Sequence, residues 1–220
     1  MERFIFNFSS KQPKKKFNVK HILGSKGANL AEMSRLGLSV PPGFTISTKV
    51  CDLFYKNKKK LPPFIIKSVK KELGLIEKAT KKRFGDQKSP LLISIRSGAR
   101  ISMPGMMDTI LNLGLNDKTV LALSKKTSNP RFANDSYRRL IQMYGSVVLN
   151  IENYHFEELI ENYKLTKGVI RDTDLDENDW AGLIKNFKDL IKKETKKDFP
   201  QNVFEQLYDA IGAVFLSWII

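Results

Sequence analysis

The chain has 220 residues, with 38 lysines and arginines against 23 aspartates and glutamates, and a formal net charge of +15. This length allows one large or two small domains with a hydrophobic core. The apolar fraction of 41% excludes a wholly disordered chain. The single cysteine, Cys51, excludes a fold held together by intrachain disulfides. No apolar run reaches the roughly 18 residues of a membrane-spanning helix, and the N-terminus lacks a signal peptide's apolar stretch, so we expect a cytoplasmic protein.

The first 115 residues alternate between helical and strand patterns. Residues 24–36 are predicted as a helix that Gly37 ends, with Leu30, Met33 and Leu36 on one face. The later expected elements are a strand at 44–47, a short helix at 50–55, a helix that Pro62-Pro63 opens and that ends at Phe84-Gly85, with the apolar face Ile66, Val69, Leu73 and Ile76, and strands at 91–96 and 109–113. Residues 97–108 contain Gly98, Pro104 and Gly105 and are predicted as a loop. This alternation predicts a mixed α/β subdomain with a mixed sheet.

From residue 116 onward the apolar residues repeat at helical spacing. The expected apolar faces run through residues 137–148, 180–191 and 203–218. The acidic stretch 172–176 is predicted as a loop followed by a helix start. We therefore expect an α/β subdomain at 1–115, a helical subdomain at 116–200, and a terminal helix at 201–220 that begins a further subdomain.

Several familiar catalytic and metal patterns are absent from the sequence. There is no GxxxxGK[ST] phosphate loop, no GxGxxG after a strand and no GxSxG elbow. One cysteine and two distant histidines argue against a zinc site. The aspartates at 172, 174 and 176 lack the glycine and terminal glutamate of a calcium loop. We predict no catalytic residue and no metal ligand.

The segment Leu23–Leu30 is the first candidate for binding chemistry. Gly24 and Gly27 let the backbone approach another group closely. Lys26 stands at the entry to the predicted helix, where backbone N–H groups favour an anion. Spacing alone also fits an ordinary glycine-capped helix with an exposed lysine.

The segment Ser94–Thr109 is the second candidate. Arg96 leaves the predicted strand beside a loop rich in glycine and serine, where a guanidinium can clamp a phosphate through two hydrogen bonds. An arginine in a salt bridge at a sheet edge explains the same pattern equally well. The methionines at 103, 106 and 107 suit core filler or an apolar wall for a ring.

The positive charge is concentrated in the first half of the chain. Residues 1–100 contain 23 lysines and arginines against 6 aspartates and glutamates, whereas residues 101–220 contain 15 against 17. A solvated surface explains this excess, and so does an anionic ligand, either nucleotide phosphates or a nucleic-acid backbone.

Three stretches together resemble the N-terminal nucleotide-binding domain of the pyruvate, phosphate dikinase family. They are GSKGANLAEMSRLGLSVPPGFTIST (24–48), PLLISIRSGARISMPGMMDTILNLGLND (90–117) and NPRFANDSYRRLIQMYGSVV (129–148). They occur in the family's order and spacing. The related phosphoenolpyruvate synthases share the Lys–Gly helix start and the strand end, but the loop SGARISMPGMMDT favours the dikinases.

The resemblance implies an ATP-grasp-like domain in a phosphotransferase. The family converts ATP, pyruvate and phosphate into AMP, phosphoenolpyruvate and diphosphate by way of a phosphohistidine. On the matching positions, Lys26 would contact the phosphates of ATP and Arg96 would clamp them. The residues that would lie beside the nucleotide are Ser97, Gly98, Ala99, Met103, Asp108 and Thr109. The ligands of Mg²⁺ are expected outside this sequence.

The chain also departs from the family pattern. Ser25 stands where glycine is usual, and Leu216 stands where arginine is usual. The second ATP-grasp lobe, the phosphohistidine domain and the phosphoenolpyruvate barrel have no counterpart in the 220 residues. We therefore expect the chain alone to be inactive, with a second polypeptide able to carry the remaining domains. The alternatives are a degenerate remnant or basic nucleic-acid-binding module, and a segment of a phosphoenolpyruvate synthase.

Overall fold

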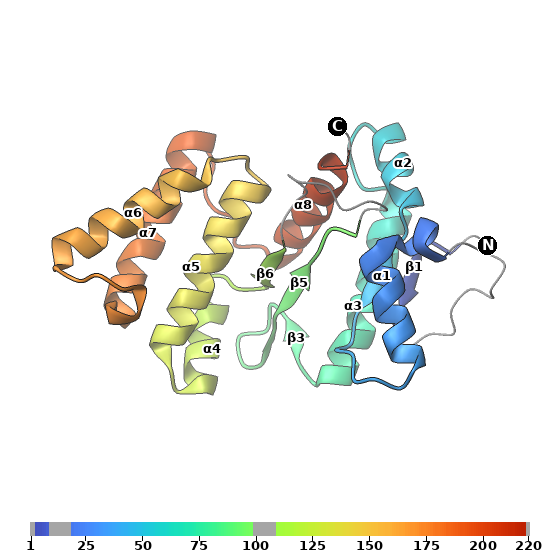
Figure 1. Cartoon of the computed structure of the whole chain (residues 1–220), viewed down its shortest axis with the longest axis horizontal. Coiled ribbons are helices and arrows are strands. Elements are labelled where there is room, and N and C mark those ends of the chain that lie inside the picture. Colours follow the sequence, from blue (N-terminus) through green and yellow to red (C-terminus); the bar gives the residue numbers. More distant parts are fainter. Residues whose placement is uncertain (1–2, 9–18, 99–108, 219–220) are drawn as a thin grey trace. The chain divides into compact units, whose positions relative to one another are not determined.

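The computed structural model describes residues 3–8, 19–98 and 109–218 (Figure 1). The chain divides into two compact units, one formed by Met1–Lys81, Arg96–Asp108 and Ile211–Ile220, the other by Lys82–Ile95 and Thr109–Ala210. We call these unit 1 and unit 2. They do not follow the ranges 1–115, 116–200 and 201–220, which remain a prediction. Helices alternate with short strands in the first half, so the predicted mixed α/β class is confirmed.

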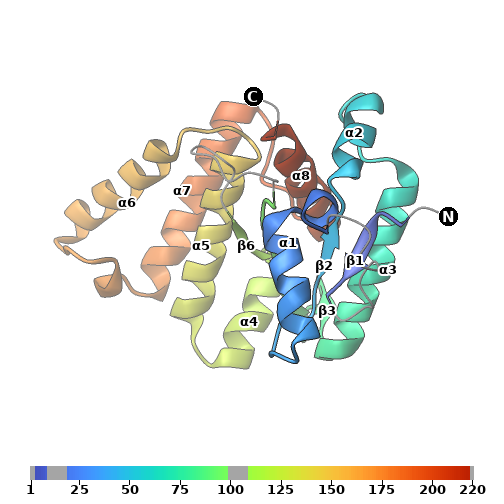
Figure 2. The same ribbon diagram turned by 45° about the vertical axis from the view of Figure 1, so that its right-hand side comes forward.

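Unit 1 is built around a two-stranded antiparallel sheet. Its elements are β1 (Ile5–Asn7), α1 (Val19–Arg35), β2 (Phe44–Ile46), α2 (Lys49–Lys56), α3 (Pro63–Thr80) and the end of α8 (Val203–Leu216). Strands β1 and β2 pair with Ile5 opposite Ile46. Helix α1 packs against β2 and α3 against β1, beside the strands seen in Figure 2. The short strand and short helix predicted at 44–47 and 50–55 are confirmed as β2 and α2.

Helix α1 buries a different face from the one its large apolar residues indicate. Leu23 and Ala31 are buried, whereas Met33 and Leu36 are 40% and 63% exposed. A Cβ atom on Gly27 would lie 2.7 Å from the Oγ1 of Thr45, so α1 meets β2 through its small residues. Close approach of the backbones therefore decides which face is buried, and the large side chains stay outside.

Helix α3 begins at Pro63, as predicted, but ends at Thr80 and not at Phe84-Gly85. Lys81 adopts the left-handed conformation (φ 54°), which ends the helix. The buried face is Ile65, Val69, Leu73 and Ile76, so Ile65 replaces the half-buried Ile66 of the prediction.

Unit 2 combines two small sheets with a set of helices. Its elements are β3 (Arg83–Phe84), β4 (Pro90–Leu91), β5 (Ile93–Ile95), β6 (Ile110–Leu113), α4 (Thr119–Thr127), α5 (Pro130–Val147), α6 (Asn153–Lys167), η1 (Asp172–Asp174), α7 (Glu177–Thr195) and the start of α8. β3 and β4 pair in parallel, and β5 and β6 pair antiparallel. The single strand predicted at 91–96 is thus two strands separated at Leu92. The described residues form three two-stranded sheets, not one mixed sheet.

The helices of unit 2 follow the predicted apolar faces. Helix α5 buries Tyr137, Leu140, Ile141 and Tyr144, and α7 buries Trp180, Leu183, Ile184, Phe187 and Ile191. The acidic start predicted for α7 is confirmed, because the carboxylate of Asp176 accepts hydrogen bonds from the backbone N–H groups of Asn178 and Asp179. None of the helices in the described ranges has the length and apolar character needed to cross a membrane.

Candidate anion-binding site

The two segments that carry Lys26 and Arg96 meet at a pair of glycines in unit 1. Gly24 has φ +69° and ψ 171°, which interrupts α1 immediately before Ser25. A Cβ atom on Gly24 would overlap the carbonyl oxygen of Gly98 and lie 2.6 Å from its carbonyl carbon. The segments therefore touch backbone to backbone, although 74 positions separate the two glycines. Only glycine fits this contact and this conformation together.

Lys26 is the second residue after the break in α1. Its side chain is exposed, and no hydrogen bond or ion pair joins it to another residue of the described ranges. The first turn of a helix presents backbone N–H groups that have no partner inside the helix and that favour an anion. The lysine ammonium and this helix start therefore favour the same kind of ligand.

Arg96 follows β5 directly and is also exposed. Within residues 3–8, 19–98 and 109–218 no carboxylate pairs with it, so the sheet-edge salt bridge considered from the sequence finds no support there. A guanidinium carries five N–H donors in a fixed plane, which suits two oxygens of one phosphate. Arg96 is thus a second exposed cation next to the glycine contact.

The segment before Gly24 is fixed by the start of α2. The backbone N–H of Thr48 donates to the carbonyl of Ile22 (2.9 Å), and the Thr48 hydroxyl donates to the carbonyl of His21 (2.6 Å). Thr48 is buried, so these bonds are shielded from water. Nothing in the local sequence pattern around Thr48 indicates a partner 27 positions away, so this contact could not be predicted from the sequence.

The other predicted loop residues have different positions. Ser97 is buried, Gly98 forms the contact with Gly24, and Thr109 lies directly before β6 in unit 2. Ala99, Met103 and Asp108 lie outside the described residues. The roles assigned to all these residues stay predictions.

Catalytic and metal chemistry have few candidates in the described chain. Burial raises the pKa of the Cys51 thiol to about 11, so this buried thiol is protonated at neutral pH and is a poor nucleophile. No three His, Cys, Asp or Glu side chains of the described residues are grouped closely enough to hold a metal ion.

An open cavity of about 540 Å³ lies elsewhere in unit 1. Its lining includes Arg3, Asn7, Pro41, Glu72 and Leu75, and neither Lys26 nor Arg96 contributes to it. The candidate site therefore lies outside this cavity.

Comparison with known proteins finds the pyruvate, phosphate dikinases. A family described as "Pyruvate phosphate dikinase, AMP/ATP-binding domain" matches residues 20–69, which include Lys26. The chain is 50% identical over 200 residues to a pyruvate, phosphate dikinase of Entamoeba histolytica, covering 91% of this chain and 23% of that relative. It is 46% identical over 219 residues to that of Rhizobium meliloti, covering 100% of this chain and 24% of the relative. A chloroplastic enzyme of Flaveria trinervia is 46% identical over 214 residues, covering 97% of this chain and 22% of the relative.

These matches confirm the family resemblance read from the sequence. The similarity extends over almost the whole chain. The chain spans about a quarter of the length of these curated relatives.

Proposed function

We propose that this chain, a homologue of the pyruvate, phosphate dikinases, binds ATP through Lys26 and Arg96 and forms part of the nucleotide cleft of such an enzyme. The observation that carries the proposal is the contact of Gly24 with Gly98, which places two segments with exposed cations against each other. The match of residues 20–69 to an AMP/ATP-binding domain supports the nucleotide as the ligand.

The two cations have different tasks in this proposal. Lys26 is a compact charge at a helix start and attracts a phosphate from any direction, whereas Arg96 fixes a phosphate through two parallel hydrogen bonds. Phosphoryl transfer depends mostly on positioning and charge neutralisation. Neither Lys26 nor Arg96 has to gain or lose a proton to carry out its task.

The rest of the cleft and the chemistry belong to segments beyond these 220 residues. In this proposal an ATP-grasp-like second lobe supplies the opposite wall and the Mg²⁺ ligands, and further domains carry the phosphohistidine and form phosphoenolpyruvate. A longer form of the chain or a second polypeptide provides them. The chain alone binds ATP without turnover, and its cytoplasmic location stays a prediction.

Calorimetric titration of the 220-residue chain with ATP tests the proposal. We expect Lys26→Ala and Arg96→Ala each to weaken binding by roughly tenfold to a hundredfold, the effect of losing a hydrogen bond to a charged group. Lys78→Ala and Arg83→Ala are matched controls, since both side chains are exposed cations that belong to neither segment of the glycine contact. Equal effects of all four variants would contradict the assigned site.

Two further measurements separate the alternatives. Steeply salt-dependent binding of single-stranded nucleic acid without any ATP signal would favour a basic nucleic-acid-binding module. Formation of phosphoenolpyruvate from pyruvate, ATP and phosphate by the chain alone would contradict its expected inactivity.

A further inference from the structure

Ser97 is held by a tryptophan from the far end of the chain. The Oγ of Ser97 accepts a hydrogen bond from the indole Nε1–H of Trp218 at 2.8 Å. Ser97 is only 1% exposed, so its side chain is directed into the protein and away from solvent. Its neighbours are Arg96, the exposed cation, and Gly98, the glycine that contacts Gly24. The hydrogen bond therefore acts on the residue that links these two parts of the site.

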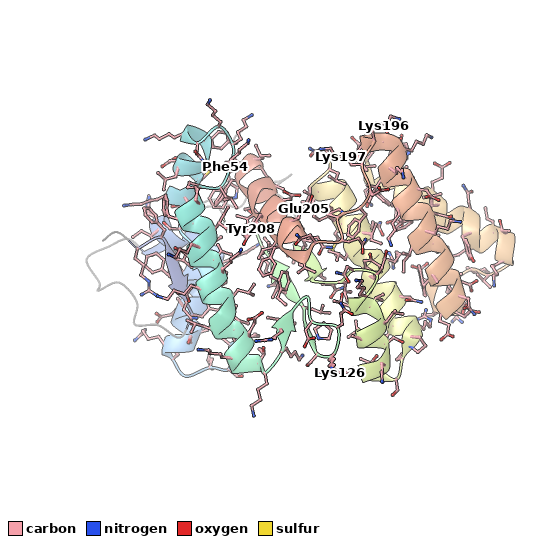
Figure 3. All side chains as sticks on the ribbon, turned by 180° about the vertical axis from the view of Figure 1, so that it is seen from behind. Phe54, Lys126, Lys196, Lys197, Glu205 and Tyr208 are labelled. Atoms are coloured by element: carbon pink, nitrogen blue, oxygen red, sulfur yellow. The ribbon has the colours of Figure 1, made fainter. Side chains whose placement is uncertain are left out.

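Trp218 is itself fixed by aromatic packing in unit 1. Its ring meets the ring of Phe215 nearly at a right angle, with 5.5 Å between the ring centroids. Phe215 in turn packs against Phe54 of α2 at 5.5 Å (Phe54 is labelled in Figure 3). Phe215 and Phe54 are both buried, so this row of rings gives the indole a defined position.

Helix α2 consequently supports both segments of the candidate site. At its start, Thr48 holds the carbonyls of His21 and Ile22, just before Gly24. Along its length, Phe54 supports Phe215 and through it Trp218, which holds Ser97. Two sets of contacts from one helix thus meet at the Gly24–Gly98 contact.

We infer that Trp218 is a positioning residue of the anion-binding site: its indole N–H fixes Ser97 and thereby the backbone that carries Arg96 and Gly98. The inference rests on the proposed function for the identity of the ligand, and it adds a residue that does not contact that ligand. A hydrogen bond to a buried hydroxyl restricts the rotation of the Ser97 backbone, so less order has to be gained when a phosphate binds to Arg96.

The test removes each half of this hydrogen bond. Trp218→Phe keeps an aromatic ring against Phe215 and deletes the donor, and Ser97→Ala deletes the acceptor. We expect each variant to weaken ATP binding by roughly threefold to tenfold, the range of one hydrogen bond. The double variant weakens it no further than the stronger single variant, because both changes remove the same bond.

Ser217→Ala is the matched control. The Ser217 hydroxyl donates to the carbonyl of Val214 and lies next to Trp218 in the chain. We expect this variant to keep the wild-type affinity for ATP. Additive losses in Ser97→Ala and Trp218→Phe, or an equal loss in Ser217→Ala, would overturn the inference in favour of general destabilisation of the helix end.

A measurement without nucleotide separates this inference from the proposed function. Backbone hydrogen exchange of the free chain reports the order of residues 97 and 98 directly. We expect Trp218→Phe and Ser97→Ala to speed exchange there by roughly threefold to tenfold, with the rest of the chain unchanged. Unchanged exchange overturns the inference even if the wild-type chain binds ATP. Faster exchange in a chain that binds no ATP overturns the proposed function and leaves the positioning role intact.

Discussion

Within the described ranges, the cations of the candidate site in unit 1 lack the ion-pair partners that several cations of unit 2 have. In unit 2, Arg138 forms an ion pair with Asp135 at 2.5 Å and lies over the ring of Trp180 at 4.6 Å, and Lys167 pairs with Asp179 at 2.6 Å. In unit 1, Lys26 and Arg96 are exposed and have no such partner within the described ranges. Cations that already have partners hold helices in place, whereas cations without partners are free to attract a ligand.

A second difference lies in two individual contacts. In unit 2 the side chain of Gln206, which is fully buried, donates to the carbonyls of Leu115 and Pro200. In unit 1 the two segments of the candidate site meet through bare backbone at Gly24 and Gly98. A contact without side chains leaves its surroundings open to a ligand.

The largest expected effect comes from Gly24→Ala. The new Cβ atom overlaps the Gly98 carbonyl and occupies a left-handed conformation, so we expect about 2–4 kcal/mol of lost stability and the loss of ATP binding. Gly37→Ala is the matched control, because Gly37 has φ +78° but nothing within 4 Å of an added Cβ. It should lose about 1 kcal/mol and keep the affinity. Urea unfolding measures the stability of the two variants, and calorimetry measures their affinity for ATP. Equal losses of stability and affinity in Gly24→Ala and Gly37→Ala would contradict the close contact.

The next largest effect is expected on stability when the ion pair of Asp179 with Lys167 in unit 2 is broken. Burial on its own would raise the pKa of Asp179, but the hydrogen bonds from Lys167 and the Asp176 backbone hold that pKa below its ordinary value. The resulting stability is present above the unfolded-state pKa and is lost as pH falls through the folded-state pKa. Asp179→Asn should therefore cost about 1–3 kcal/mol at neutral pH.

Urea unfolding as a function of pH checks the Asp179 prediction. The difference between Asp179→Asn and the wild type should shrink between about pH 5 and pH 1. Asp189→Asn, an exposed position on the same helix, is the control and should show no such trend. A difference that is constant over this range would contradict the ion pair as its source. At neutral pH both variants should keep the wild-type affinity for ATP, because neither residue belongs to the segments of Lys26 and Arg96.

A smaller effect is expected from Arg96→Lys. The lysine keeps the charge and loses the planar pair of donors, so we expect ATP binding to weaken by roughly tenfold. Calorimetric titration measures this, with Arg83→Lys as the control that should leave the affinity unchanged. Wild-type affinity in Arg96→Lys would mean that charge alone is recognised and that the clamp geometry is wrong.

The smallest effect is expected on the outer face of α1. Met33 is 40% exposed, so Met33→Gln should change stability by less than about 0.5 kcal/mol. Ala31→Gln, on the buried face, should destabilise by about 1–3 kcal/mol through overpacking. Urea unfolding measures the free energy of unfolding of both variants. A larger loss of stability in Met33→Gln than in Ala31→Gln would support the buried face predicted from the sequence.

The helical half of the fold was the most predictable from the sequence. The apolar repeats in α5 and α7 are long enough that tertiary contacts do not change which residues are buried, and Asp176 was correctly placed at a helix start. Helix α1 was mispredicted because its buried face is set by close backbone approach at Gly27, a property of the neighbouring strand. The end of α3 was mispredicted because Lys81 adopts a left-handed conformation that its residue type does not indicate.

The two cations of the candidate site could be singled out from the sequence, and their role stays a prediction; the contacts that hold their segments could not be foreseen. Lys26 and Arg96 were singled out because cations beside glycines suit an anion. The contact between Gly24 and Gly98 could not be derived, since a close approach depends on how the chain folds back. The bond from Trp218 to Ser97 joins residues 121 positions apart, and no local pattern carries that information.

In the proposed function, the segments of Lys26 and Arg96 form one anion-binding site. The most direct measurement is an NMR titration of the isotope-labelled 220-residue chain with ATP, followed at the backbone amides. We predict that the amides of residues 25–27 and 97–98 shift together and yield one dissociation constant. Shifts confined to one of the two segments, or spread over the lysine clusters while both segments stay unchanged, would contradict the claim.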